Sequence, residues 1–332
     1  MCEETLDSMT IPTSDAQASL VMLSRELRES ALAVLWRQWR AVGGQAASKG
    51  EAHAIVDPEA LVLLSLTLVE HERRLADILH DWTVLNSDLL SVQRAKNLVE
   101  AYPAGAAGRL AWLAGIAFRE GKDLRWRSLA EGSSNDPGAK VETPPHRSNK
   151  MRAVRVRLDG AATLLLRLRL GFGVGAKADL LGFLLGLAGE WAIVRDIRAA
   201  TGYTTATVRR AAEDMAAAQL VHVTTRQPVA FRADPRAWSE VLGFPEGPPP
   251  WRSWQQRFAF VAAFLAWADE ARAKPLTLYV LGVKGRELLE QHRLAFERDL
   301  VAVWSEHTTV GDWAAFLQRA VMSLVEWMAE RA

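Results

Sequence analysis

Two adjacent arginines, Arg209 and Arg210, lie in the first half of a helical pattern over residues 204–218. A guanidinium group can donate paired hydrogen bonds to O6 and N7 of guanine, and a small methyl-bearing side chain such as Thr205 or Ala206 can contact the methyl group of thymine. At roughly 100° per residue, these four residues fall opposite an apolar side. That side consists of Val208, Ala211, Ala212 and Met215. The pattern predicts a helix with a small apolar underside and an outer face suited to the edges of base pairs.

The segments around this helix contain the signals needed to position it. Residues 176–189 predict an apolar supporting helix, and residues 193–200 predict a short helix with Arg195 directed outward. Gly202 can adopt the left-handed conformation that ends a helix, and Thr204 is a favoured N-cap residue. The sequence therefore predicts two helices joined by a tight turn, with the second beginning at Thr204.

A β-hairpin is expected immediately after these helices. Two short runs alternate apolar and polar residues, which is typical of half-buried strands. The inward residues are predicted to be Val221, Val223, Val229 and Phe231. Thr225, Arg226 and Gln227 form the expected polar tip, which could reach phosphate or an adjacent minor groove, and Arg232 lies on the outward side of the second strand.

The run TGYTTATVRRAAEDMAAAQLVHV, followed by a polar tip and VAFRADP, resembles the ArsR/MarR-type winged helix-turn-helix transcriptional regulators of prokaryotes. The resemblance covers the middle of the chain only and implies a homodimer that binds a two-fold site in double-stranded DNA. It places residues 204–218 in the major groove and the wing, residues 221–233, on the backbone or minor groove. The residues expected to bind DNA are Thr204, Thr205, Ala206, Arg209, Arg210, Arg195, Thr225, Arg226, Gln227 and Arg232.

The distribution of charge agrees with this interpretation. The whole chain of 332 residues has a formal net charge of only +1, but residues 151–240 hold thirteen Lys and Arg against eight Asp and Glu. A local basic excess that coincides with the predicted helices is the expected footprint of a phosphate-binding surface.

The predicted organisation is mainly α-helical, with the hairpin as its only convincing β-structure. We expect a disordered leader over residues 1–16, a helical N-terminal domain over 17–130 and a linker over 131–150. A winged helix domain follows over 151–242, and GFPEGPPP forms a hinge before a helical C-terminal region over 251–332. Apolar patterns such as 251–271 and 311–330 could form a bundle between subunits or bind a partner. The thirteen tryptophans could fill helix–helix cores or line an aromatic ligand pocket.

Other chemistry has weak support in the sequence. The single cysteine, Cys2, excludes an internal disulfide and a cysteine-based zinc site, and Gly171–Lys177 has neither phosphate-loop nor dinucleotide-binding spacing. The His80-Asp81 doublet near His71 lacks evident further metal ligands. The chain has no signal-peptide pattern and no membrane-spanning run, so we expect a cytoplasmic protein that does not bind membranes. The sequence therefore predicts a DNA-binding regulator, without enzyme activity, metal or cofactor, that responds to an unknown small-molecule or protein effector. One alternative is a protein–protein interaction module. The other is an enzyme site around His71, His80 and Asp81.

Overall fold

The computed structural model describes residues 13–45, 50–132, 152–273, 277–297 and 310–331. These residues form a mainly helical protein with one small antiparallel sheet, which confirms the predicted helical class. Most of the expected leader and of the linker over 131–150 lies outside the described residues. No helix in the described ranges has the length and apolar character required to cross a membrane.

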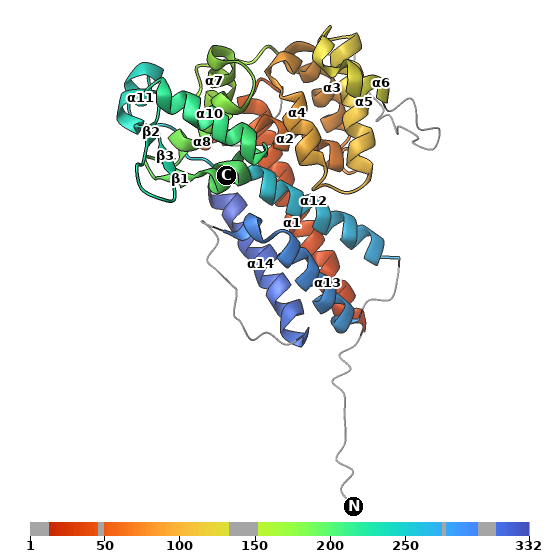
Figure 1. The fold of residues 1–332 in the computed structure, drawn as a ribbon. Helices are drawn as coiled ribbons and strands as arrows, with labels where there is room; N and C mark the ends of the chain where they lie inside the picture. Colours follow the sequence, from red (N-terminus) through yellow and green to blue (C-terminus); the bar gives the residue numbers. More distant parts are fainter. Residues whose placement is uncertain (1–12, 46–49, 133–151, 274–276, 298–309, 332) are drawn as a thin grey trace, which may run out of the picture.

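In the N-terminal part, the apolar helix α2 (Pro58–Leu68) packs against α1 (Thr13–Ala41), α3 (Arg74–Asn86), α4 (Val92–Val99) and α5 (Gly105–Arg119) (Figure 1). Asp57 begins α2 as its N-cap, with a side-chain oxygen that accepts a hydrogen bond from the backbone N–H of Ala60 at 3.1 Å. Ser91 caps α4 in the same way through the N–H of Arg94. The last helix of this part, α6 (Arg127–Gly132), packs against α5.

The C-terminal helices pack against α1, although most of the chain separates them in sequence. They are α12 (Trp254–Ala271), α13 (Leu278–Gln291) and α14 (Val310–Arg331), with the short 3-10 helix η5 (Arg293–Phe296) after α13. Figure 1 shows α1, α12, α13 and α14 as a bundle below the rest of the molecule. The apolar faces that the sequence analysis assigned to a bundle between subunits are therefore buried against helices of the same chain.

The middle of the chain forms a separate layer at the other end of the molecule. Its elements are α7 (Leu164–Phe172), α8 (Ala176–Gly186), β1 (Ala192–Ile193), α9 (Val194–Thr201), α10 (Thr205–Ala217), β2 (His222–Val223), β3 (Ala230–Arg232) and α11 (Pro235–Leu242). The sheet has the order β1-β3-β2 with both pairs antiparallel, and Phe231 on β3 lies opposite Ala192 and Val223. We call residues 176–233 the helix–hairpin unit.

The buried side chains form two hydrophobic cores. One core is shared by the N-terminal helices and by α12 to α14, and the other lies inside the helix–hairpin unit and α7. The helix α1, near the start of the chain, shares its apolar side with α12 and α14, near its end. The pairing of such distant segments depends on topology, which periodicity along the chain does not encode.

Candidate functional site

The outer face of α10 is exposed along its first half. Thr204 has the extended backbone of an N-cap, and its hydroxyl oxygen accepts a hydrogen bond from the N–H of Thr207 at 3.3 Å. The underside is buried, with at most 4% of any of its side chains exposed, and comprises Val208, Ala211, Ala212 and Met215. The opposite side, which is exposed to solvent, comprises Thr205, Ala206, Arg209, Arg210 and Glu213. The predicted separation of an apolar underside from a polar outer face agrees with this burial.

The two arginines of this face have no carboxylate partner among the described residues. The nearby carboxylate of Asp214 instead forms a 2.8 Å ion pair with Lys177 at the start of α8. Arg210, Lys177 and Asp214 line a shallow surface hollow of about 380 Å³ between α8 and α10. Arg209 and Arg210 therefore remain available to an external anion.

The hairpin presents its tip to solvent. Thr225, Arg226 and Gln227 are all exposed, and Thr224 closes the loop by pairing with Ala230 through its backbone N–H and its side-chain oxygen, each at 2.9 Å. These contacts hold the three tip residues away from the core of the unit.

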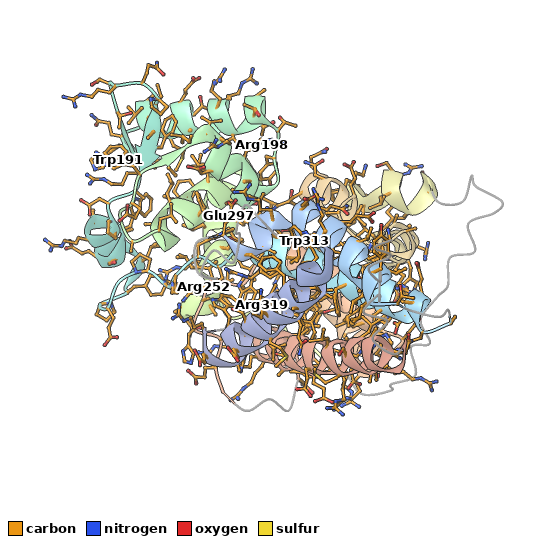
Figure 2. All side chains as sticks on the ribbon, turned by 90° about the horizontal axis from the view of Figure 1, so that it is seen from below. Trp191, Arg198, Arg252, Glu297, Trp313 and Arg319 are labelled. Carbon is orange, nitrogen blue, oxygen red and sulfur yellow. The ribbon has the colours of Figure 1, made fainter. Side chains whose placement is uncertain are left out.

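Arg232 and Arg195 have more specific surroundings than the sequence indicated. The guanidinium of Arg232 lies 4.8 Å from the ring centroid of Trp191, so it stacks on an aromatic face at the sheet instead of extending freely. Figure 2 shows Trp191 on the helix–hairpin unit, far from Trp313 of the bundle. The Arg195 side chain is 82% exposed and lies 3.7 Å from a carboxylate oxygen of Asp196.

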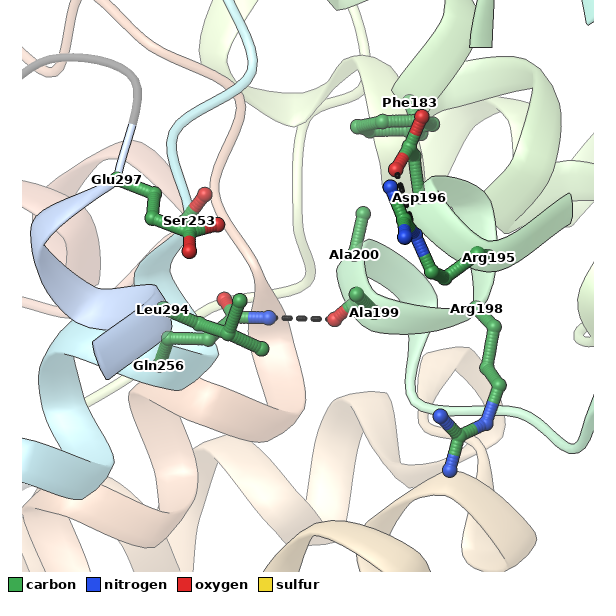
Figure 3. Close-up of a pocket in the computed structure, with 10 residues that line it drawn as sticks. All are labelled: Phe183, Arg195, Asp196, Arg198, Ala199, Ala200, Ser253, Gln256, Leu294 and Glu297. Atoms are coloured by element: carbon green, nitrogen blue, oxygen red, sulfur yellow. Dashed lines mark hydrogen bonds and ion pairs between the residues drawn. The ribbon is translucent and has the colours of Figure 1, made fainter. Parts of the chain in front are cut away.

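A cleft of about 450 Å³ separates α9 from the start of α12 and from η5 (Figure 3). Arg195 and Arg198 line its α9 side, and Ser253 and Glu297 lie across from them. The side-chain amide of Gln256 donates a hydrogen bond across the cleft to the backbone carbonyl of Ala199. The cleft thus lies between the helix–hairpin unit and the bundle, and the hydrogen bond from Gln256 connects the two.

The turn between α9 and α10 is held by side chains from two other parts of the molecule. Arg94 on α4 donates to the carbonyl of Thr201 at 2.6 Å, and Asn97, one turn later, donates to the carbonyl of Gly202 at 2.9 Å. Gln255 on α12 donates, like Gln256, to the carbonyl of Ala199. The carbonyl groups at the C-terminal end of a helix lack partners within the helix, and these side chains provide them.

A buried network of ion pairs lies directly behind this turn. Arg94 pairs with Asp57 and Glu59, in each case at 2.5 Å, and Arg169 on α7 pairs with Glu59 at 2.6 Å and with Asp179 on α8 at 2.7 Å. All five side chains are at most 1% exposed. Glu59 bridges the two arginines, so the network connects the N-terminal helices to α7 and α8.

Burial alone would raise the pKa of Glu59, but the positive charges of Arg169 and Arg94 outweigh that effect and lower its pKa to about 2. For Arg94, burial would lower the pKa, yet the neighbouring carboxylates hold it above the ordinary value. Both groups are therefore ionised at neutral pH. A buried charge of this kind is tolerated only when its partners and hydrogen bonds are complete.

Tyr203 connects the network to the beginning of α10. Its hydroxyl donates to Asp179 at 3.1 Å and lies 3.1 Å from the hydroxyl oxygen of Ser91. Burial raises the pKa of Tyr203 above the ordinary value, so the phenol remains a neutral donor. Because Thr204 and α10 follow directly, the position of the exposed face depends on buried contacts of the preceding residue.

Sequence reasoning missed this network. Asp57 was explained by its role as the N-cap of α2, so its second role as a partner of Arg94 was not suspected. A signal was present in Arg169 and Asp179, since each is a charged residue within a strongly apolar helical run. Such residues are rarely buried unless they are paired, and the pairing could have been suspected.

Other candidate chemistry is not assembled into a recognisable centre. Nδ1 of His80 lies 3.0 Å from Asp81 and its Nε2 lies 3.1 Å from Glu120, whereas His71 lies 3.4 Å from Asp269. Within the described ranges, no group of three or more His, Cys, Asp and Glu side chains is arranged to hold a metal ion.

Comparison of the chain with models of protein families, with curated protein sequences and with solved structures gave no match.

Proposed function

We propose that the protein is a winged helix-turn-helix DNA-binding protein that acts as a transcriptional regulator. The observation that carries the proposal is the uncovered face of α10, where Arg209 and Arg210 project from a helix whose underside is fully packed. The order of helix, strand, two helices and hairpin, with the sheet order β1-β3-β2, supports the same assignment.

In this proposal the first half of α10 enters the major groove. Arg209 and Arg210 donate to guanine, while Thr205 and Ala206 lie close enough to contact thymine methyl groups. Thr204 continues to cap the helix, so its exposed backbone edge can approach a phosphate. These contacts determine which sequence is preferred.

The remaining predicted residues act on the DNA backbone. Arg226, with Thr225 and Gln227, reaches phosphate or the minor groove from the hairpin tip. Arg195 neutralises phosphate beside the first helix of the pair. Arg232 contributes mainly to the local charge, because its guanidinium stacks on Trp191.

The buried contacts behind the turn give the proposed reading helix a rigid base. Arg94 and Asn97 hold the turn from α4, and Gln255 holds it from α12. A helix that is ordered before binding loses less conformational entropy when it enters the groove. The N-terminal helices and the bundle therefore serve as a scaffold for the helix–hairpin unit.

The deciding experiment selects duplexes from a random library with the full-length protein and then measures affinity by fluorescence anisotropy. Arg209→Ala/Arg210→Ala is expected to abolish preference for the selected sequence. The matched control is Arg25→Ala/Arg286→Ala, which removes the same charge from α1 and α13, where both arginines are in exposed ion pairs with acidic residues of their own helices. Unchanged affinity of the first variant for the selected duplex would remove the assignment.

Salt dependence separates DNA binding from the alternative of a protein–protein interaction module. Neutralising several phosphates makes the logarithm of affinity fall steeply with the logarithm of salt concentration, whereas docking to a protein does not require duplex binding at all. We also propose a homodimer on a two-fold DNA site. The apolar sides of α12 and α14 are buried within one chain, so the proposed dimer uses a surface other than these sides. Light scattering at micromolar concentration measures whether the dimer forms.

A further inference from the structure

One flank of the exposed face of α10 carries the hollow of about 380 Å³ that lies between α8 and α10. Ala206 and Arg210 line the hollow from the outer face of α10, and Ala176 and Lys177 line it from the first turn of α8. Asp214 follows Arg210 by one helical turn, lines the same hollow and is exposed. The hollow is therefore continuous with the face that the proposed function places against base pairs.

An ion pair joins the two helices at this hollow. Nζ of Lys177 lies 2.8 Å from a carboxylate oxygen of Asp214, and the two side chains are 48% and 49% exposed. An ion pair with this exposure contributes little, equivalent to at most about a fivefold change in an equilibrium constant. Since Lys177 and Arg210 oppose a single carboxylate, the residues that line the hollow carry a net charge of +1. Another anion can therefore replace Asp214 at little cost.

The dimensions of DNA indicate which anion this is. The major groove is about 12 Å wide, and an α-helix with its side chains is about 10–12 Å across, so an inserted helix fills the groove. Residues on its flanks then face the phosphates of the two strands, and only its outer face meets the bases. Because α8 packs beside α10, the hollow lies on such a flank when Ala206 and Arg210 face the bases.

We propose that a phosphate of the DNA backbone takes the place of Asp214 at Lys177, so that Asp214 is an internal competitor that limits affinity for every duplex. This inference rests on the proposed DNA binding and deepens it. In the free protein the carboxylate of Asp214 neutralises Lys177. On the duplex the ammonium group turns to the phosphate and the carboxylate turns to solvent. Arg210 remains directed to the base pairs, so the exchange changes affinity without changing the preferred sequence.

Two consequences distinguish this exchange from a general effect of charge. A contact between Lys177 and phosphate releases a counterion, so it contributes about 0.9 to the slope of log affinity against log salt. The carboxylate of Asp214 weakens binding chiefly by holding Lys177, so its effect on affinity depends on the presence of that lysine. Side chains that act through one another are coupled in a double-mutant cycle, whereas independent charges are additive.

Fluorescence anisotropy of the full-length protein, with the selected duplex and with an unrelated duplex, tests the exchange. Lys177→Met should weaken binding to both duplexes about fivefold at about 0.15 M salt and reduce the slope by about one, while Lys177→Arg should retain the slope. Asp214→Asn should strengthen binding to both duplexes by about twofold to fivefold, the range that an exposed ion pair can contribute. In the Lys177→Met background, Asp214→Asn should have a much smaller effect.

Lys284 and Glu287 on α13 provide the matched control. Their side chains form an ion pair that is similarly exposed, at 48% and 55%, and α13 belongs to the bundle at the other end of the molecule from α10. Lys284→Met and Glu287→Gln change the net charge by the same amounts as the two test substitutions. Both should leave the affinity and the salt slope nearly unchanged.

The outcomes separate this inference from the function on which it rests. Absence of salt-dependent duplex binding by the natural protein would overturn both. A sequence preference that requires Arg209 and Arg210, together with an unaltered slope in Lys177→Met, would overturn the phosphate contact alone. An equal gain from Asp214→Asn with and without Lys177 would mean that the carboxylate acts only through its charge, and it would overturn the exchange.

Discussion

Arg94 on α4 and Thr201 at the end of α9 are joined by a 2.6 Å hydrogen bond, although 107 residues separate them in the chain. The same guanidinium is fully buried and paired with Asp57 and Glu59. One side chain therefore belongs both to an ion-pair network of the N-terminal helices and to the cap of the turn before α10. Disturbing the network should move or loosen the proposed reading helix.

The first prediction concerns Arg169. Replacing it by Met leaves the carboxylates of Glu59 and Asp179 buried with one partner fewer, and breaking a buried pair in this way typically costs about 3–5 kcal/mol. Urea unfolding followed by circular dichroism measures the loss. Arg157→Met is the control: its ion pair with Asp159 is highly exposed, and exposed pairs contribute about 0–1 kcal/mol. Equal stability of the two variants would contradict a structural role for the network.

The second prediction concerns acid stability. The pKa of Glu59 is lowered from 4.5 to about 2, so in that range the unfolded chain binds a proton that the folded chain does not. The resulting stability is fully present above pH 4.5 and is lost as pH falls towards 2. Glu59→Gln removes this titration, and its unfolding free energy should depend on pH less steeply by up to about 1.4 kcal/mol per pH unit. If the unfolding free energies of the natural protein and of the Glu59→Gln variant depended on pH in the same way, the pKa of Glu59 would not be lowered in the folded protein.

A third prediction uses two glycines with nearly the same backbone. Gly202 and Gly243 end α9 and α11 with φ of 73° and 70°. A Cβ at Gly202 would lie 2.8 Å from a methyl carbon of Leu98 and 3.3 Å from Gln255, whereas one at Gly243 would meet nothing within 4 Å. Gly243→Ala should cost about 1–2 kcal/mol for the left-handed backbone, and Gly202→Ala should cost about 1–3 kcal/mol more for the close contact.

Urea titration of both glycine variants gives this difference directly. A Gly202→Ala variant that is no less stable than Gly243→Ala would mean that α4 does not press against the turn. The comparison is informative because the backbone contribution is common to both positions.

The fourth prediction concerns Asn97, which donates to the carbonyl of Gly202. Asn97→Ala should cost about 0.5–1.5 kcal/mol and speed hydrogen exchange at the turn, because one of its caps is lost. Lys96→Ala is a suitable control, since Lys96 lies on the same helix and its side chain hydrogen-bonds to Ser128, away from the turn. If the backbone amides at the turn exchange at the same rate in the two variants, the hydrogen bond from Asn97 to Gly202 does not stabilise the turn.

The parts of the fold that the sequence predicted depend on neighbouring residues. The cap at Thr204, the left-handed Gly202 and the buried Val208 follow from local chemistry and periodicity, and the structure agrees at each. The two-residue strand β1 was missed because it is too short to show alternation. Val223 was expected to point inward, but 46% of it is exposed on the two-residue edge strand β2, where little of the unit covers it.

The parts that the sequence did not predict depend on distant residues. The partner of Arg169 is 110 positions away at Glu59, and the partners of α1 lie at the other end of the chain. Local patterns identify an unusual residue but do not identify its partner.

The last prediction distinguishes contacts to the DNA backbone from contacts to bases. Arg226 lies at the exposed tip of the hairpin, where the proposed function places a phosphate. Arg226→Ala should weaken binding to the selected and to unrelated duplexes by a similar factor, and should reduce the slope of log affinity against log salt by about one. Arg209→Ala should instead weaken the selected sequence much more than others, because a lost contact to guanine removes discrimination of about 1–3 kcal/mol.

Anisotropy titrations at several salt concentrations measure both quantities on the same samples. Arg236→Ala, which removes an exposed arginine from α11, controls for the change in net charge and should leave the slope nearly unchanged. An Arg226→Ala variant with an unaltered slope, or with a loss confined to the selected duplex, would place the hairpin tip away from the phosphates. In that case α10 would still contact the bases, and Arg195 on α9 would be the next residue to test as a contact to phosphate.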